Sequence, residues 1–199
     1  AVYSALPGRP PELTGPRAVE DASLCGTALK ELRERGARDG EPWTAGDEIA
    51  GLEQWHARIS RYRADLELPF QIALERVSRS LESLPKMALA ACHRDFHEGQ
   101  LLLGAGGCGL LDFDTLYLAA PALDIGNFCA HVRLSEIRGN GPARDFEARF
   151  QACAGTGHAG EAARNAAWKR AALLRLAAIH AFSSEPKDVV ERLILEAGQ

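Results

Sequence analysis

The residues that could do chemistry are concentrated in one stretch near the middle of the chain. The segment HRDFHEGQ contains a carboxylate at Asp95 and a carboxamide at Gln100, and LLDFD adds carboxylates at Asp112 and Asp114. Phosphoryl transfer requires such groups, because one carboxylate orients the attacking hydroxyl while further oxygen ligands hold Mg²⁺ on the phosphates. The spacing predicts that these side chains converge on one pocket.

Simpler interpretations exist for single members of this stretch. An H-x-D triplet is common by chance, and an aspartate at a strand end is often a turn or cap residue. Cys92, His93 and His97 offer metal ligands, but their spacing gives no closed tetrahedral set, so we expect loop histidines there. The remaining histidines show no partnering pattern and are expected on the surface or within helices: His56, His131, His158 and His180.

The elements that must position these residues are mostly helices. Apolar residues recur at helical spacing over 17–35, 45–64, 70–84, 122–134, 143–154, 160–182 and 186–197. Short strands are predicted at 87–92, 100–103 and 109–113, the last two forming a hairpin across the sequence GAGG. No helix or lysine follows GAGG, so a tight turn is expected rather than a phosphate cradle. The predicted fold class is α+β, mostly α-helical, with a small β-hairpin insert.

Composition and charge fit one soluble globular domain. The chain has 199 residues, of which 46% are hydrophobic and 25% charged, and a prior of about 150 residues per domain leaves too few for two. A net charge of −4 supplies no basic field for nucleic acid or an anionic membrane, so neither is expected as a partner. Five cysteines without a C-x-x-C pair predict reduced thiols and a cytoplasmic location.

Three motifs, taken in order, resemble the aminoglycoside phosphotransferase and choline kinase superfamily, whose members have a protein kinase-like fold. That family carries H-x-D-x-x-x-x-N, then an apolar strand ending in D-[FLW]-[DEG], then G-D-P-x-x-D-[LI]-[AG]. This chain has HRDFHEGQ, LLDFD and AAPALDIGNF. In addition, YSALPG resembles the hinge between lobes, and CGTALKELRERG resembles the first helix of the C-terminal lobe. The resemblance spans nearly the whole chain.

The resemblance implies a role for each matched residue. Asp95 corresponds to the catalytic aspartate that accepts a hydrogen bond from the substrate hydroxyl, and Asp112 to the aspartate that binds Mg²⁺. His93 corresponds to the motif histidine that supports the catalytic loop, and Asp124 to the helix aspartate that braces the backbone of this loop. The implied cofactors are ATP (or GTP) and Mg²⁺.

One matched position departs from the family pattern. Gln100 stands where the family has a metal-binding asparagine, so the same amide oxygen is carried on a longer side chain. Three interpretations follow. Gln100 binds the metal with a shifted backbone, or the site holds a single metal through Asp112 and Asp114. In the third interpretation, activity is weak or absent. Asp114 follows Asp112 by two residues on one predicted strand, which would point both side chains to the same face.

The nucleotide site implied by the resemblance uses residues near the start of the chain. The backbone around Ser4 and Ala5 falls where the hinge contacts adenine, and Leu102 resembles the apolar floor of the adenine pocket. An exposed cleft face with an apolar patch at Val2, Tyr3, Leu6 and Leu102 would favour a homodimer.

The sequence lacks the residues of the family's N-terminal lobe. We therefore expect residues 1–16 to be a hinge or linker segment and 17–199 to be the helical C-terminal lobe, with its catalytic loop at 93–100 and its metal-binding strand end at 110–114. The chain would then be a truncated piece of a longer kinase. A naturally short protein is the alternative.

Two functions remain open at this stage. The first is an ATP- and Mg²⁺-dependent phosphotransferase acting on a hydroxyl of a small polar molecule, with the isolated 199-residue chain inactive. The second is a pseudokinase or lobe-only binding module. The acceptor is not specified; side chains at 43–62 that could contact it are aromatic (Trp43, Trp55, Tyr62) or acidic (Asp47, Glu48, Glu53). Core packing and a solvated helix face are their simpler interpretations.

Overall fold

The computed structural model describes residues 7–36, 39–155 and 157–199. Within these residues, the helices are α1 (Ala18–Arg35), α2 (Ala45–Tyr62), α3 (Ala64–Glu82), α4 (Ala122–Ile137), α5 (Arg144–Ala154), α6 (Glu161–His180) and α7 (Lys187–Ala197). The strands are β1 (Pro42–Trp43), β2 (Ala90–Cys92), β3 (Leu101–Gly104), β4 (Gly107–Leu110) and β5 (Tyr117–Ala119). The predicted class, α+β and mostly helical with a small hairpin, is confirmed.

The strands form two small sheets. β3 and β4 are an antiparallel hairpin in which Leu101 pairs with Leu110 and Gly104 with Gly107, so GAGG is a tight two-residue turn. In the other sheet, β5 pairs antiparallel with β2 and parallel with β1. The strand predicted at 109–113 is wrong in its end point, because β4 stops at Leu110.

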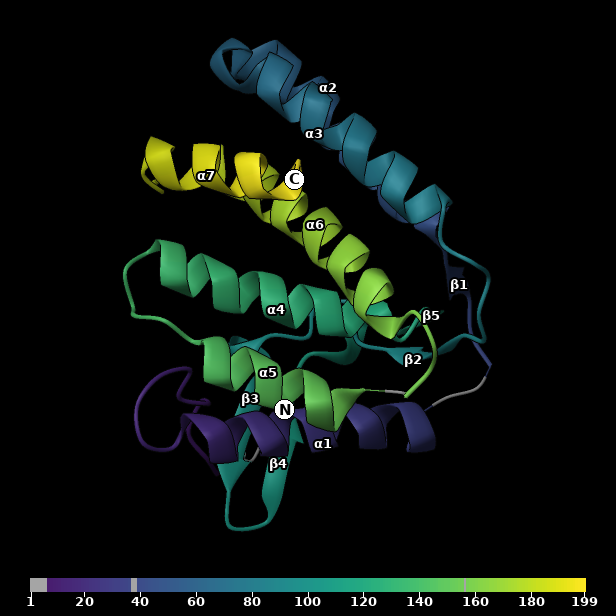
Figure 1. Cartoon of the computed structure of the whole chain (residues 1–199), viewed down its shortest axis with the longest axis vertical. Coiled ribbons are helices and arrows are strands. Elements are labelled where there is room, and N and C mark those ends of the chain that lie inside the picture. The colour runs from purple at the N-terminus through teal and green to yellow at the C-terminus, as the bar shows by residue number, and fades with distance from the viewer. Residues whose placement is uncertain (1–6, 37–38, 156) are drawn as a thin grey trace, which may run out of the picture.

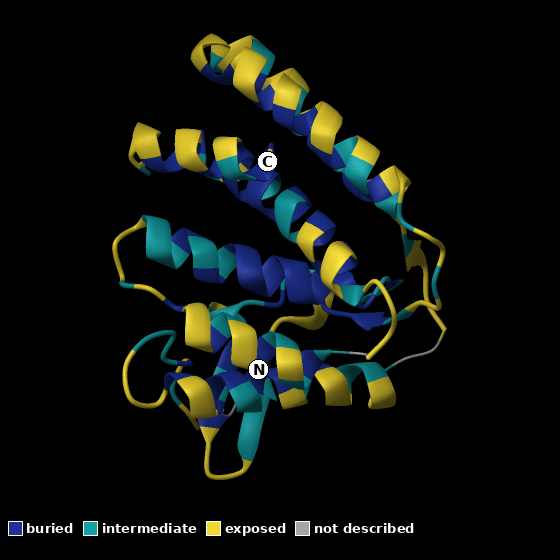
Figure 2. Ribbon diagram, in the orientation of Figure 1, coloured by how far each residue is buried: buried dark blue, intermediate teal, exposed yellow. Residues whose placement is uncertain are grey.

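The helices pack in layers around α4 and α6. α4 lies against α6, α6 against α7, α1 against α5 and α2 against α3. Figure 1 shows the α2–α3 pair at one end of the molecule, and α1, α5 and the β3–β4 hairpin at the other. Residues 122–130 of α4 are all buried, as the dark ribbon in Figure 2 shows. Because α4 has no solvent-facing stripe along this part, it is the central helix of the fold.

The segment before α1 is attached to the hairpin. The backbone of Arg9 pairs with that of Leu103 through two hydrogen bonds, of 3.0 and 2.7 Å. Its guanidinium donates to both carboxylate oxygens of the buried Asp21 on α1, at 2.6 and 2.8 Å. Residues 7–16 therefore connect the edge of β3 to the start of α1. No helix in the described residues is long and apolar enough to cross a membrane.

One glycine permits the closest approach between the central helices. A Cβ atom at Gly126 of α4 would lie 2.5 Å from the backbone N of Lys169 and from the backbone C of Trp168, both on α6. These are backbone atoms, so they cannot move away as a side chain would.

We predict that Gly126→Ala lowers the free energy of unfolding by about 1–3 kcal/mol, because it forces α4 and α6 apart. Gly51→Ala on α2 is the matched control, since a Cβ there meets no atom within 4 Å. That change should stabilise the protein by about 0.5–1 kcal/mol through helix propensity. Urea denaturation measures both, and a Gly126→Ala variant as stable as the wild type would contradict this account of the helix contact.

Candidate active site

A buried carboxylate holds the loop that follows β2. Asp124, in the first turn of α4, is fully buried and accepts hydrogen bonds from the backbone N–H groups of His93 (2.7 Å) and Arg94 (2.8 Å). Burial raises the pKa of Asp124, and the two N–H groups oppose this shift. Arg94 has φ 67°, a left-handed conformation that is unfavourable for a side chain other than glycine. The pair of hydrogen bonds therefore fixes a strained turn immediately before Asp95.

The side chain of His93 lies inside the protein and connects the loop to a second turn. Its Nε2–H donates to the carbonyl of Leu111 (2.7 Å), and its own carbonyl accepts from the hydroxyl of Thr115 (2.7 Å). The backbone N–H of Leu111 donates in turn to the carbonyl of Gln100 (2.9 Å). The residue next to Asp112 is thus attached to both ends of the loop. A fully buried ring cannot touch a substrate, so His93 can act only by positioning.

Asp95 lies on the partly exposed side of this loop. Its side chain is 48% exposed, and its Oδ2 accepts a hydrogen bond from Nε2 of Gln100 at 3.1 Å. The Nε2 atom of His97 lies 3.6 Å from the same oxygen. Partial burial disfavours the charged form, but His97 and Gln100 outweigh it and lower the pKa of Asp95 to about 2. Asp95 is therefore ionised throughout the neutral range, with Oδ1 free of both of these neighbours.

Contacts at the edge and at the face of the His97 ring fix its orientation. Its Nδ1 accepts from the backbone N–H of Gly99 (3.1 Å), which places the ring proton on Nε2, toward Asp95. Burial opposes protonation of His97, yet the interaction with Asp95 raises its pKa above the ordinary value. On its face, His97 stacks on His131 with ring centroids 4.3 Å apart and planes 6° from parallel.

His131 belongs to this site, which corrects the expectation that it has no partner. A signal was available: Asp124, Asn127 and His131 are spaced i, i+3, i+7 and so lie on one face of α4. Asn127 donates to the carbonyl of Phe96 (3.1 Å), next to Asp95. The face of α4 that carries Asp124 thus contacts the loop around Asp95 at three successive points. Burial, with the nearby charge of His97, lowers the pKa of His131 to about 3.

The two imidazoles do not form a preformed metal centre with Asp95. One ligand atom from each of Asp95, His97 and His131 lies within 4.8 Å of the others. However, nitrogen lone pairs lie in the ring plane, and two nearly parallel stacked rings cannot direct theirs at one ion. We interpret the cluster as an orienting stack beside Asp95.

The oxygen groups expected to hold Mg²⁺ lie at the adjoining turn. Asp112 has φ 56° and precedes the 3-10 turn Phe113–Thr115. Asp112 and Asp114 are both exposed, but the prediction that they share one strand face is wrong, because no strand reaches them. Gln100 donates through its nitrogen to Asp95, which leaves its amide oxygen as a ligand. Exposed carboxylates and an amide oxygen are the type of ligand that Mg²⁺ prefers, so the chemistry of these groups fits the ion.

The expected nucleotide-contacting residues are only partly described. Leu102 is half-buried on β3. Ser4 and Ala5, together with Val2, Tyr3 and Leu6 of the expected apolar patch, lie outside the described residues. The hinge contact and the patch at the start of the chain therefore stay predictions.

Trp43 of β1 and Glu48 of α2 are connected to this loop through arginine side chains. Glu48 is buried, so the expectation of a solvated face is wrong there: it accepts from Trp43 Nε1 (3.1 Å) and pairs with Arg175. Arg175 also donates to Asn127 (2.7 Å). The guanidinium of Arg94 lies 3.4 Å from the ring centroid of Trp43.

The aromatic residues of this region do not form one wall. Trp43 packs edge-on against Tyr117, with ring centroids 5.7 Å apart. Trp55 stacks on Phe182 at 6.2 Å, and Tyr62 is 62% exposed. Their contacts differ, and only Trp43 adjoins the loop.

Comparison with known proteins decides the family. A family model described as "phosphotransferase enzyme family" matches residues 1–174, which is most of the chain and includes the loop, the turn and α4. The chain belongs to the phosphotransferase enzyme family. The resemblance found from three motifs is thereby confirmed. A search of curated protein sequences finds no match to this family member.

Solved structures share the fold of this phosphotransferase-family chain. A choline/ethanolamine kinase family protein from Mesorhizobium loti has a TM-score of 0.62 at 16% identity, over 94% of this chain and 64% of its own. A microcompartment-associated aminopropanol kinase has 0.61 at 15%, over 90% and 59%. A spectinomycin phosphotransferase, solved with ADP and spectinomycin, has 0.57 at 10%, over 97% and 68%. The chain thus spans less than two thirds of the first two structures.

The low pKa of His131 predicts how the free energy of unfolding depends on pH. Its pKa falls from an ordinary 6.5 to about 3 on folding, so no stability is lost above pH 6.5. Below pH 6.5, His131 binds a proton in the unfolded chain but not in the folded protein. The free energy of unfolding therefore declines as pH falls toward 3. Between pH 7 and 5, the wild type should lose about 1–2 kcal/mol more than His131→Phe, which keeps the ring stack but cannot titrate.

Urea denaturation at the two pH values measures this difference. The raised pKa of His97 acts in the opposite direction, and this group is present in both proteins. Parallel loss of stability in wild type and His131→Phe would contradict the account of a buried neutral His131.

Proposed function

We propose that this chain carries the catalytic loop and metal-binding turn of an ATP- and Mg²⁺-dependent kinase that phosphorylates a hydroxyl group of a small polar molecule. The observation that carries the proposal is the constellation around Asp95: an ionised, half-exposed carboxylate, hydrogen-bonded to Gln100, on a loop joined by His93 to the turn of Asp112. Membership of the phosphotransferase enzyme family supports this reading.

Asp95 is the residue proposed to contact the acceptor. With Oδ2 engaged by Gln100, its Oδ1 accepts a hydrogen bond from the acceptor hydroxyl and orients the oxygen for attack on the γ-phosphate. Positioning of this kind supplies much of the rate in phosphoryl transfer, because little covalent chemistry is left to the protein. As the hydroxyl oxygen bonds to the γ-phosphorus, the bond from this phosphorus to the bridging oxygen breaks and ADP leaves, and Asp95 receives the proton of the hydroxyl.

His97 and His131 are proposed to act through Asp95. The Nε2–H of His97 faces Oδ2, and the stack on His131 prevents rotation of the His97 ring. The carboxylate is thus held between Gln100 and His97 before any substrate arrives, which limits the reorganisation required in the transition state.

Asp112 and the amide oxygen of Gln100 are proposed to hold Mg²⁺, with the exposed Asp114 as a further oxygen group at the same turn. When bound, the ion supplies charge neutralisation to the phosphates. The longer side chain of glutamine is accommodated here by its hydrogen bond to Asp95, which sets the direction of the amide.

We also propose the domain division and setting expected from the sequence. Residues 1–16 act as a hinge segment and 17–199 as a C-terminal lobe, with ATP or GTP bound beside Leu102. The cytoplasmic setting is proposed from the five widely spaced cysteines without a C-x-x-C pair. A homodimer through the cleft face stays a prediction.

The acceptor class is proposed from the printed names of the structural neighbours. They include choline/ethanolamine, aminopropanol and glucosamine kinases, all named for amines that carry a hydroxyl. An amino alcohol or aminosugar is therefore the first class to test, with Asp114 and Glu98 near the loop as acidic groups for the ammonium.

The test is turnover by the product of the complete gene, because the chain spans only part of its structural neighbours. ADP release is followed with MgATP and a panel of amino alcohols, aminosugars and sugars. Asp95→Asn should reduce kcat by about 10²–10⁴-fold, since the hydroxyl loses its acceptor. Asp145→Asn, at an exposed aspartate of α5, is the matched control and should leave kcat unchanged.

Two results would overturn the proposal. Undiminished phosphorylation by Asp95→Asn would remove Asp95 from the reaction. If the wild type binds no nucleotide with Mg²⁺ and transfers no phosphate to any acceptor, a pseudokinase or binding role becomes the better account.

A further inference from the structure

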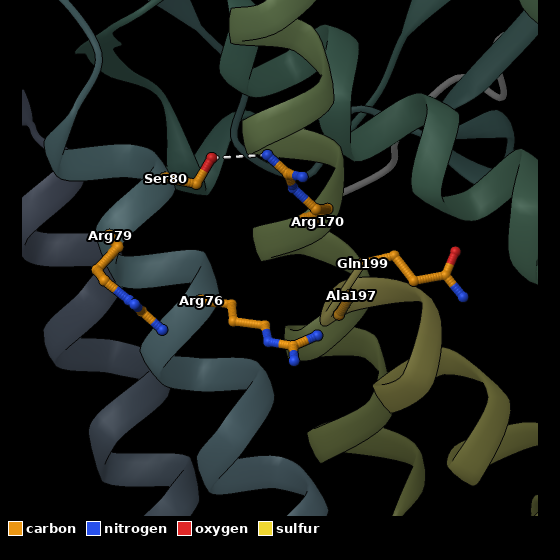
Figure 3. A pocket seen from close by; sticks show the side chains of 6 residues that line it. All are labelled: Arg76, Arg79, Ser80, Arg170, Ala197 and Gln199. Atoms are coloured by element: carbon orange, nitrogen blue, oxygen red, sulfur yellow. Dashed lines mark hydrogen bonds between the residues drawn. The ribbon is translucent and has the colours of Figure 1, made fainter.

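A second candidate site lies outside the catalytic loop, between α3, α6 and the end of α7. It is a cavity of about 440 Å³ whose lining is dominated by arginine: Arg76, Arg79, Ser80, Arg170, Ala197 and Gln199. Figure 3 shows these side chains: Arg170 extends from α6 toward Ser80, Arg76 extends from α3 toward the end of α7, and Arg79 lies along α3.

The protein gives these three arginines only uncharged acceptors. Arg170 donates to the hydroxyl of Ser80 (2.7 Å), Arg76 to the carbonyl of Gly198 (2.5 Å) and Arg79 to the carbonyl of Glu75 (3.2 Å). Within the described residues, no ion pair at 4.0 Å or less involves any of the three. Moreover, the Nε atom of Arg170 is buried and has no hydrogen-bond partner in the described structure.

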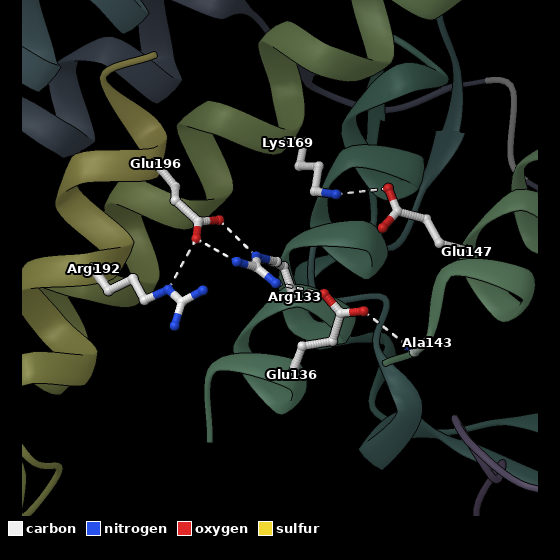
Figure 4. Close-up of polar contacts among 7 residues, drawn as sticks. All are labelled: Arg133, Glu136, Ala143, Glu147, Lys169, Arg192 and Glu196. Carbon is white, nitrogen blue, oxygen red and sulfur yellow. Dashed lines mark hydrogen bonds and ion pairs between the residues drawn. The ribbon is translucent and has the colours of Figure 1, made fainter. Parts of the chain in front are cut away.

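Two cations close to the cleft on the neighbouring helices are paired with carboxylates. Arg133 on α4 contacts Glu136 (2.7 Å) and Glu196 (2.5 Å), and Lys169, adjacent to Arg170, contacts Glu147 (2.6 Å). Figure 4 shows this network, in which Glu196 of α7 turns toward Arg133 and Arg192. The carboxylate closest in sequence to the cleft residue Ala197 is thus engaged with other arginines, and none of the three cleft arginines has an ion-pair partner within 4.0 Å among the described residues.

The chemistry of these groups selects an oxyanion. Guanidinium groups present planar, forked donors that match phosphate bidentately, and Ser80 adds a hydroxyl. The volume is within the range of about 300–1,000 Å³ that is typical for small-molecule sites, so it exceeds the needs of one phosphate group.

An apolar groove adjoins the arginine cleft and shares Arg76 and Gln199 with it. Its walls include Pro69 and Ile72 of α3 and Leu195 of α7. Ile72 is 45% exposed and Leu195 65% exposed, so this groove offers apolar contact next to the positive charges.

We propose that the cleft binds a phosphomonoester, whose phosphate is held by Arg76, Arg79 and Arg170 and whose apolar portion lies in the groove beside Ile72. The site shares no residue with the proposed catalytic loop or metal turn. Binding at this site can therefore be tested independently of the proposed kinase activity.

The test is isothermal titration of the protein, without nucleotide or Mg²⁺, with inorganic phosphate and with phenyl phosphate at constant ionic strength. Phenyl phosphate should bind at least about threefold more tightly, because its ring is buried in the groove. Arg170→Gln and Arg79→Gln should each weaken both ligands by about tenfold or more, since each removes a charge-assisted contact. Ile72→Ser should abolish the preference for phenyl phosphate and leave phosphate affinity unchanged.

Arg144→Gln, at an exposed arginine that begins α5, is the control for a general loss of positive charge and should leave both affinities unchanged. Circular dichroism checks that each variant is folded, and the exposed Arg79 provides a variant that leaves the core intact. The proposal would be overturned if Arg144→Gln weakened binding of both ligands as much as the cleft variants do. It would also be overturned if neither ligand showed saturable binding up to about 10 mM, which corresponds to a binding free energy weaker than about 3 kcal/mol.

Discussion

The carboxylate of Asp124 is the group on which the candidate site depends. It lies at the start of the central helix, fully buried, and its two oxygens accept from the backbone N–H groups of His93 and Arg94. A buried carboxylate is costly unless it is hydrogen-bonded, and a left-handed arginine persists only where its surroundings hold it. The backbone N–H groups of the loop supply the hydrogen bonds that the carboxylate needs, and the carboxylate holds the left-handed turn at Arg94. As a result, α4 and the loop before Asp95 form one structural unit.

The rest of the fold serves to keep α4 in place beneath this loop. Gly126 allows the close contact with α6, and Arg175 of α6 joins Asn127 to Glu48 at the start of α2. Asn127 in turn holds the carbonyl of Phe96. The start of the helix pair α2–α3 is therefore connected by polar contacts to the backbone next to Asp95. Separately, α3 and α6 carry the three arginines of the second cleft, none of which has an ion-pair partner among the described residues.

The sequence predicted the helices and the order of the motifs, because both are local patterns. Apolar spacing identifies a helix whatever it packs against, and the residues from Cys92 to Asp124 are close enough in the chain to be compared as motifs. The sequence pattern places Asp114 on a strand with Asp112, and this is wrong because the backbone is left-handed at Asp112. No residue preference in the sequence indicates this left-handed conformation. His131 lies in an almost wholly buried helix segment, where apolar neighbours obscure the polar face. Arg170 and Ser80 are 90 positions apart, so only the packing of α3 on α6 creates their cleft.

The most direct test of this account is amide hydrogen exchange at His93 and Arg94, measured by NMR in the wild type and in Asp124→Asn, with the buried Leu174 of α6 as the internal reference. If the carboxylate holds the loop, both amides exchange with the slowly opening core in the wild type. In Asp124→Asn their exchange should be at least about 100-fold faster relative to Leu174, because the loop then opens locally. An unchanged ratio would show that the loop keeps its conformation without Asp124 and would contradict the account.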